Sequence, residues 1–124
     1  MLPMKRLDAF FSQKSELLRD KETYKGLLKY AECDVCGDLD DALRSMESAI
    51  GQREEELSDE ENAIKEILSS VEDLTMRSIL ILRFVEAQPW KIIGAVFGIS
   101  GHAASDRTYK FIRKIQGGAQ NDAE

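Results

Sequence analysis

A long heptad repeat in the middle of the chain limits its fold more than any other feature. Apolar residues recur there at alternating steps of four and three, and only Arg53 and Glu60 interrupt the pattern. The repeat positions are Leu39, Leu43, Met46, Ile50, Arg53, Leu57, Glu60, Ile64, Ile67, Val71 and Leu74. This spacing puts one apolar stripe on a helix, which another helix has to cover. Ser58 and Glu61 have capping-box spacing, so the alternative is a new helix starting there.

The N-terminal segment predicts a second helix, from about Met4 to Ala31. Its expected apolar stripe is Leu7, Phe11, Leu18, Tyr24 and Leu28. The run from Cys33 to Gly37 interrupts the pattern, and Asp38 can cap the helix that follows.

Opposite charge favours packing of these two helices as an antiparallel hairpin, a coiled-coil arm. Residues 1–31 carry a formal charge of +3, whereas residues 32–73 carry −12. A first helix of about 28 residues spans only about 40 Å, which is too short to cover the whole repeat. The excess therefore needs the C-terminal unit or a second copy of the chain, and we favour a homodimer.

The stretch from Trp90 to Ile115 predicts two short helices joined by a glycine turn. Gly94 allows a close helix crossing, Gly98 can end the first helix in the left-handed conformation, and Ser100 can cap the second. The residues expected to face inward are Ile93, Val96 and Phe97 before the turn, and Ala104, Thr108, Phe111 and Ile115 after it.

A third helix is expected before this pair, with Thr75 as its cap and Phe84 near its end. Pro89 is expected at the first position of the next helix, with Trp90 covering the small core. We therefore predict an all-α chain. It would have an N-terminal antiparallel helical hairpin at residues 1–74, a three-helix helix-turn-helix unit at 75–116 and a flexible tail at 117–124.

Basic residues are concentrated in the C-terminal unit, although the chain has a formal net charge of −6. Residues 76–115 hold seven Arg or Lys and two acids, a net of +5, whereas residues 1–75 sum to −9. A basic face on an acidic chain favours contact with a nucleic-acid phosphate backbone.

The order of features in this unit resembles region 4 of bacterial sigma factors. The matching features are Arg83-Phe84, Trp90, Ile93-Gly94, the run Phe97-Gly98-Ile99-Ser100, Arg107 and the basic end. The chain differs from that pattern at Gly94, Ala104 and Asp106. As a whole, a heptad segment followed by this unit resembles small phage-borne transcriptional regulators of the ArpU and RinA type. That resemblance implies a role in switching on phage or prophage late genes.

The resemblance assigns DNA recognition in the major groove to a helix from His102 through Lys114. Residues opposite its apolar stripe are the candidate DNA-binding side chains: His102, Ala103, Asp106, Arg107, Tyr109, Lys110, Arg113 and Lys114. Arg107 or Lys110 could read guanine edges and Asp106 could accept from cytosine, whereas Arg113 and Lys114 suit phosphates. The alternatives are a solvated basic face and, for Arg107, an internal ion pair with Glu86.

Other kinds of site find little support in the sequence. Cys33 and Cys36 have Cys-x-x-Cys spacing, but the chain has one His and no second cysteine pair. A zinc site shared by two chains and a dithiol switch are the alternatives to ordinary reduced thiols, which we favour, so we expect no metal and no cofactor. We find no Ser-His-acid order and no phosphate-binding glycine loop, and expect no enzyme. The chain lacks an apolar run of membrane length and a signal peptide, so we expect a cytoplasmic protein without membrane contact.

These observations lead to two hypotheses. The first is a sequence-specific regulator of transcription that binds double-stranded DNA, is assembled as a homodimer by its arm, and contacts RNA polymerase as the resemblance implies. The second is a non-enzymatic protein-interaction adaptor, whose heptad arm binds RNA polymerase or another helical partner.

Overall fold

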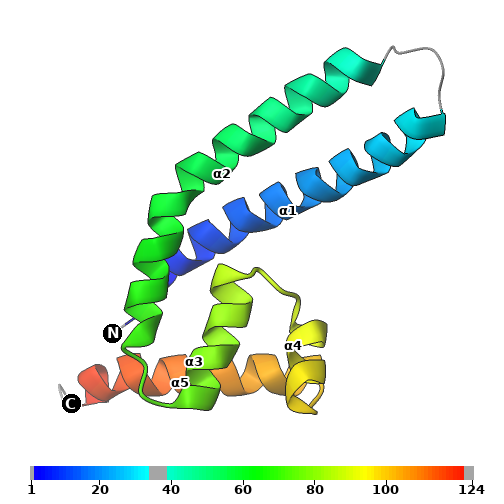
Figure 1. Cartoon of the computed structure of the whole chain (residues 1–124). Coiled ribbons are helices and arrows are strands. Elements are labelled where there is room, and N and C mark those ends of the chain that lie inside the picture. Colours follow the sequence, from blue (N-terminus) through cyan, green and yellow to red (C-terminus); the bar gives the residue numbers. More distant parts are fainter. Residues whose placement is uncertain (1, 34–38, 122–124) are drawn as a thin grey trace.

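The computed structural model describes residues 2–33 and 39–121. Every regular element in these residues is helical, which confirms the all-α prediction. The elements are α1 (Met4–Cys33), α2 (Leu39–Ser69), α3 (Leu74–Leu80), the π-helical turn η1 (Ile81–Val85), α4 (Trp90–Phe97) and α5 (Gly101–Asn121). The helices α1 and α2 run along each other in opposite directions, and the shorter elements gather with α5 at one end of the pair (Figure 1).

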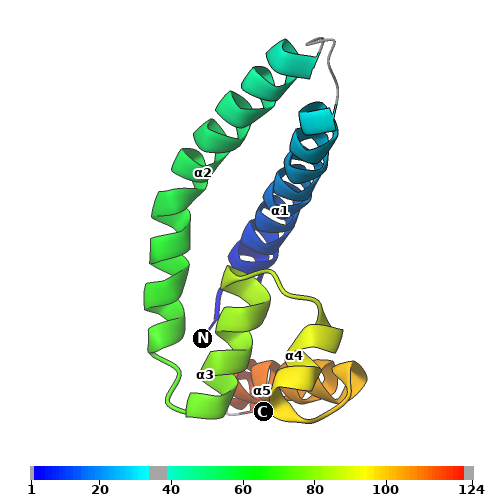
Figure 2. The same cartoon turned by 45° about the vertical axis from the view of Figure 1, so that its right-hand side comes forward.

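The helix α2 is continuous through the heptad repeat, so the Ser58–Glu61 capping box does not start a new helix. Both views show that α2 curves along its length (Figures 1 and 2). Leu57 and Ile64 are buried, as the repeat predicts, but Leu68 is buried more deeply than its neighbour Ile67. Leu74 does not belong to the repeat, because it lies on α3 and is 68% exposed.

The apolar face of α1 differs from the predicted stripe. Leu7, Phe10 and Leu17 are buried, whereas Phe11 and Leu18 lie on the flank and Leu28 is exposed. The heptad positions before and after Leu17 are occupied by Lys14 and Lys21. A lysine can hold such a position because its aliphatic stem packs while its ammonium group reaches a carboxylate.

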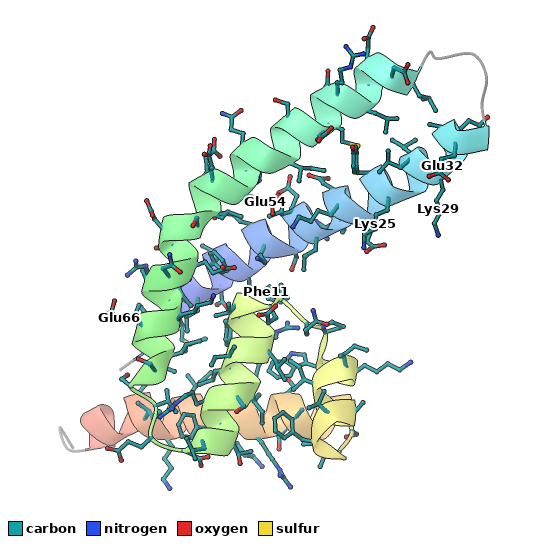
Figure 3. All side chains as sticks on the ribbon, viewed as in Figure 1. Phe11, Lys25, Lys29, Glu32, Glu54 and Glu66 are labelled. Atoms are coloured by element: carbon teal, nitrogen blue, oxygen red, sulfur yellow. The ribbon has the colours of Figure 1, made fainter. Side chains whose placement is uncertain are left out.

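Ion pairs between α1 and α2 agree with the opposite charges of the two segments. Lys14 pairs with Glu61 at 2.7 Å and Lys21 with Glu54 at 2.8 Å. Glu54 lies on the side of α2 that faces α1 (Figure 3). Arg6 donates from Nε and Nη2 to the two carboxylate oxygens of Glu60, both at 2.7 Å. Glu60, a polar position of the repeat, therefore holds the start of α1 against α2.

The C-terminal elements cover the part of the repeat that was expected to need another partner. The core is one connected cluster that includes Phe10 of α1, Leu68 of α2, Phe84 of η1 and Ile112 of α5. The helix α1 has 30 residues and α2 has 31, so the two match in length. The expected excess of apolar repeat therefore gives no argument for a second copy of the chain.

The helix ends of the C-terminal unit differ from the prediction, by one or two residues at the starts of α3 and α4 and by five at the end of α5. The cap of α3 is Asp73, whose side chain accepts from the backbone N of Met76 at 3.0 Å, and Thr75 lies inside the helix. Pro89 precedes α4 as its cap residue, one position earlier than expected. The helix α5 continues to Asn121, past the predicted boundary at residue 116, and Gln116 donates from Nε2 to the Leu2 carbonyl at 2.8 Å. The expected Asp38 cap and Cys36 lie outside the described residues.

None of the described helices carries an apolar stretch long enough to span a lipid bilayer.

Candidate nucleic-acid interface

A three-residue turn joins α4 to α5, and its chemistry is the predicted one. Gly98 has φ 71° and ψ 27°, the left-handed conformation that ends α4. The Ser100 hydroxyl accepts from the backbone N of Ala103 at 3.0 Å and so caps α5. The turn is closed by a backbone hydrogen bond from Ile99 N to the Gly94 carbonyl at 2.9 Å. Local sequence therefore fixes the angle between the two helices.

Two glycines let the start of α5 approach α4 closely. A Cβ on Gly94 would lie 2.5 Å from the Ile99 carbonyl oxygen and 2.7 Å from the Ser100 carbonyl carbon. A Cβ on Gly101 would lie 2.9 Å from the backbone N of Lys91. All of these neighbours are backbone atoms, which cannot move aside as a flexible side chain can. The sequence predicted the role of Gly94 but not that of Gly101.

The inner faces of α4 and α5 are only partly those expected. Ile93, Ala104 and Thr108 are fully buried. The Thr108 hydroxyl donates to the Ala104 carbonyl at 2.7 Å, so its polar group is satisfied inside the helix. Phe97, Phe111 and Ile115 are half-buried.

Two positions correct the expected inner faces. Val96 is 62% exposed, because Gly94 brings the turn backbone against the other side of α4. Ile112, which was not expected in the core, is buried beside Thr108 on the inner face of α5.

The outer face of α5 presents the predicted residues as two adjacent rows at helical spacing. One row contains His102, Asp106, Tyr109 and Arg113, and the other contains Ala103, Arg107, Lys110 and Lys114. All are exposed except Ala103, which is half-buried beside the turn. The second row is a basic stripe of three cations, Arg107, Lys110 and Lys114, that spans about two turns of the helix.

Asp106 and Lys110 connect the two rows. Their side chains form an ion pair at 3.0 Å. The hydrogen bond from Lys110, helped by its charge and by those of His102 and Arg113, holds the pKa of Asp106 below its usual range. The carboxylate thus offsets part of the positive charge and holds the Lys110 side chain toward the first row.

Two of the seven cations of residues 76–115 serve the fold and not the outer surface. Arg77 donates from Nε to the Val71 carbonyl at 2.8 Å, which ties α3 to the end of α2. Arg83 is half-buried, and burial lowers the pKa of its guanidinium. The alternative role for Arg107 is not seen, because no ion pair joins it to Glu86 in the described part of the chain.

Aromatic contacts indicate a structural role for Trp90 in the C-terminal unit. Its ring meets the ring of Tyr109 edge to face, with centroids 6.0 Å apart. Tyr109 is therefore held against α4, although 37% of it is exposed. This contact restricts how far the Tyr109 ring can reorient toward a ligand.

Lys91 is an exposed cation of this surface that was not among the predicted site residues. It lies in the first turn of α4, and its backbone N faces Gly101 at the start of α5. The sequence could have identified Lys91, because this residue directly follows Pro89-Trp90, where a helix is expected to start. The exposed cations of the surface are thus Lys91, Arg107, Lys110, Arg113 and Lys114.

Within the described residues, no cluster of three or more His, Cys, Asp or Glu side chains could hold a metal ion. Comparison with protein-family models, curated proteins and solved structures finds no match to this chain.

Proposed function

We propose that the chain is a sequence-specific regulator of transcription that binds double-stranded DNA through α5. The observation that carries the proposal is the Gly98 turn, which holds α5 against α4 while the basic stripe of Arg107, Lys110 and Lys114 stays exposed. The helix α5 crosses the end of the α1–α2 pair, so both long helices lie to one side of it (Figure 1). A helix exposed in this way and held by a second helix suits entry into the major groove.

The exposed side chains have two expected roles, contact with base edges and contact with phosphates, according to where each lies. Arg107 and Lys110 lie in the first half of α5, where a recognition helix contacts base edges, and both can donate to guanine O6 and N7. Asp106 accepts from Lys110 in the free protein and could accept from cytosine N4 in a complex. Arg113 and Lys114 lie farther along α5, and Lys91 lies on α4. These three side chains would bind phosphates, which position the helix without reading sequence.

The proposal keeps two further expectations, of which the homodimer no longer rests on an excess of heptad repeat. A homodimer would place two copies of α5 on half-sites of a two-fold symmetric operator. The likeness to phage-borne regulators suggests late-gene promoters as targets and RNA polymerase as a second contact.

Salt dependence of duplex binding tests the proposal. With three phosphate contacts, from Arg113, Lys114 and Lys91, log K should fall against log salt with a slope of about −3. Lys114→Gln should weaken binding to all duplexes and reduce the slope by about 1. Lys29→Gln is the matched control, because Lys29 is exposed near the far end of α1 (Figure 3) and should leave both quantities unchanged. No retention of duplex at low salt would overturn the proposal.

One observation favours a protein-interaction adaptor as a second candidate, with its binding surface on α4 and not on the heptad arm. Ile92 and Val96 are 48% and 62% exposed and lie four residues apart on α4, so they form an apolar pair on the outer surface. Exposed apolar pairs at this spacing suit a helical partner. Replacing both with Ser should abolish binding to purified RNA polymerase if the adaptor role is correct. Duplex binding should then be unaffected, which separates the two functions.

A further inference from the structure

An apolar groove lies between the long helix α1 and the segment that joins η1 to α4. Its volume is about 700 Å³. Phe11 and Leu18 form its wall on α1, and Ala87 and Pro89 form the opposite wall. Figure 3 shows Phe11 where α1 approaches the end of the η1 segment. This volume falls in the range of about 300–1,000 Å³ that is typical of small-molecule sites.

Arg83 brings a positive charge into this apolar setting. Its guanidinium carbon lies 4.0 Å from the ring centroid of Phe11 and 4.5 Å from that of Trp90. Its Nη1 donates to the Gln88 carbonyl at 3.1 Å, but its Nε is buried without an acceptor among the described residues. No carboxylate of the described residues lies within ion-pair distance of Arg83, and the charge of Asp8 acts on it only from farther away. A half-buried cation without a paired carboxylate is costly, and an anionic ligand in the groove can supply that pair.

The other charges of the groove offset each other. Arg19 and Glu22 line its α1 side and are one helical turn apart, so together they add no net charge. Ser15 and Thr23 add hydroxyl groups on the same side. Arg83 therefore leaves the lining of the groove with a net positive charge, and the charge that complements it is negative.

The backbone beside the groove is irregular on the side of Arg83. The turn η1 is π-helical, with Glu86 N bonded to the Ile81 carbonyl at 3.0 Å. Ala87 follows with φ 53°, a left-handed conformation that a residue with a Cβ rarely adopts. Such π-turns and strained residues occur often at ligand sites.

We propose that this groove binds a small apolar monocarboxylate. The carboxylate would contact the Arg83 guanidinium, and the hydrocarbon part would lie against Phe11, Leu18 and Pro89. This inference does not depend on DNA binding.

Octanoate, used below its micellar concentration, is a suitable probe, and Trp90 is the reporter because it is the only tryptophan of the chain. We expect a saturable change in Trp90 fluorescence and a higher thermal midpoint. Octanol, which has the same chain length and no charge, should bind about tenfold more weakly, since it lacks the charge-assisted hydrogen bonds. Equal effects of octanoate and octanol, or no saturable change with octanoate, would overturn the proposal.

Arg83→Gln should reduce octanoate affinity by about tenfold or more, whereas Arg44→Gln, at an exposed position of α2, should leave it unchanged. If Arg83→Gln does not fold, Leu18→Glu tests the same site from α1. The new carboxylate would sit in the groove wall and repel the ligand, so octanoate binding detected by NMR shifts should be lost. Unchanged octanoate affinity in a folded Arg83→Gln or Leu18→Glu protein would contradict the assignment.

Discussion

At the scale of single residues, Gly94 is the position where one methyl group would disturb the molecule most. Gly94→Ala would press a Cβ against the backbone of Ile99 and Ser100 at 2.5 and 2.7 Å, so the turn would have to open. We expect a loss of about 2–3 kcal/mol in the free energy of unfolding, as for other overpacked sites. Urea denaturation followed by circular dichroism measures it.

Gly51→Ala is the control for that substitution. A Cβ at Gly51, within α2, meets nothing within 4 Å. Alanine should therefore stabilise the helix by about 0.5–1 kcal/mol through its better propensity. If both substitutions had the same effect, the close approach at Gly94 would not exist in solution.

Acidification should weaken the contact between α1 and α2. The hydrogen bond from Arg6 lowers the pKa of Glu60 below its ordinary 4.5. For Glu61, burial raises the pKa, but the hydrogen bond and charge of Lys14 outweigh it, so that pKa is lowered too. Because the unfolded carboxylates take up protons at higher pH, this stability is present above about pH 4.5 and is lost as pH falls through the lower folded values.

The measurable consequence is a modest fall in the thermal midpoint between about pH 5 and pH 3, since water screens these pairs. Glu60→Gln with Glu61→Gln should flatten that fall. Glu55→Gln, at an exposed position of the same helix, should not. A profile that is equally steep in all three proteins would show that other groups set the acid response.

At the scale of elements, the start of α3 depends on Asp73 and not on Thr75. Asp73→Ala removes the hydrogen bond to Met76 N and should cost about 1 kcal/mol of stability. Thr75→Ala, two residues later and exposed, should change stability by less than about 0.5 kcal/mol. Denaturant midpoints of the two variants measure the difference. A larger loss of stability with Thr75→Ala than with Asp73→Ala would identify Thr75 as the cap.

The elements that the sequence predicted well are those fixed by local chemistry. The continuous α2 follows from its repeat, and the turn at Gly98 follows from the glycine and the Ser100 cap. The face of α1 was misassigned because Lys14 and Lys21 occupy apolar heptad positions, a pattern that only the paired Glu61 and Glu54 explain.

The remaining differences arise where tertiary contacts decide the structure. Arg83 lies within the π-turn η1, and the left-handed Ala87 follows this turn. The position of Arg83 depends on Phe11, a residue more than seventy positions away in the chain. Tertiary contacts also decide which of the seven cations of residues 76–115 are exposed: Lys91, which was not predicted as a site residue, lies on the surface, whereas Arg77 and Arg83 serve the fold. Net charge by segment finds the basic region but cannot tell an exposed cation from one that serves the core.

At the scale of the whole molecule, one core connects the long helices to the C-terminal unit. It includes Phe10, Leu68, Phe84 and Ile112, which lie on four different elements. The chain should therefore unfold in a single cooperative transition. Circular dichroism follows mainly α1 and α2, whereas Trp90 fluorescence follows α4, and the two signals should give the same midpoint. Two separated midpoints would mean that residues 1–74 and 75–116 fold independently.

Selection of bound sequences from a random duplex pool at moderate salt would show whether α5 reads DNA sequence. We expect an enriched motif that is lost with Arg107→Ala/Lys110→Ala but kept with Lys25→Ala/Lys29→Ala on α1 (Figure 3). A two-fold symmetric motif would support the homodimer. If the unmodified chain enriches no motif, or if both double variants enrich the same one, α5 does not read DNA sequence through these residues.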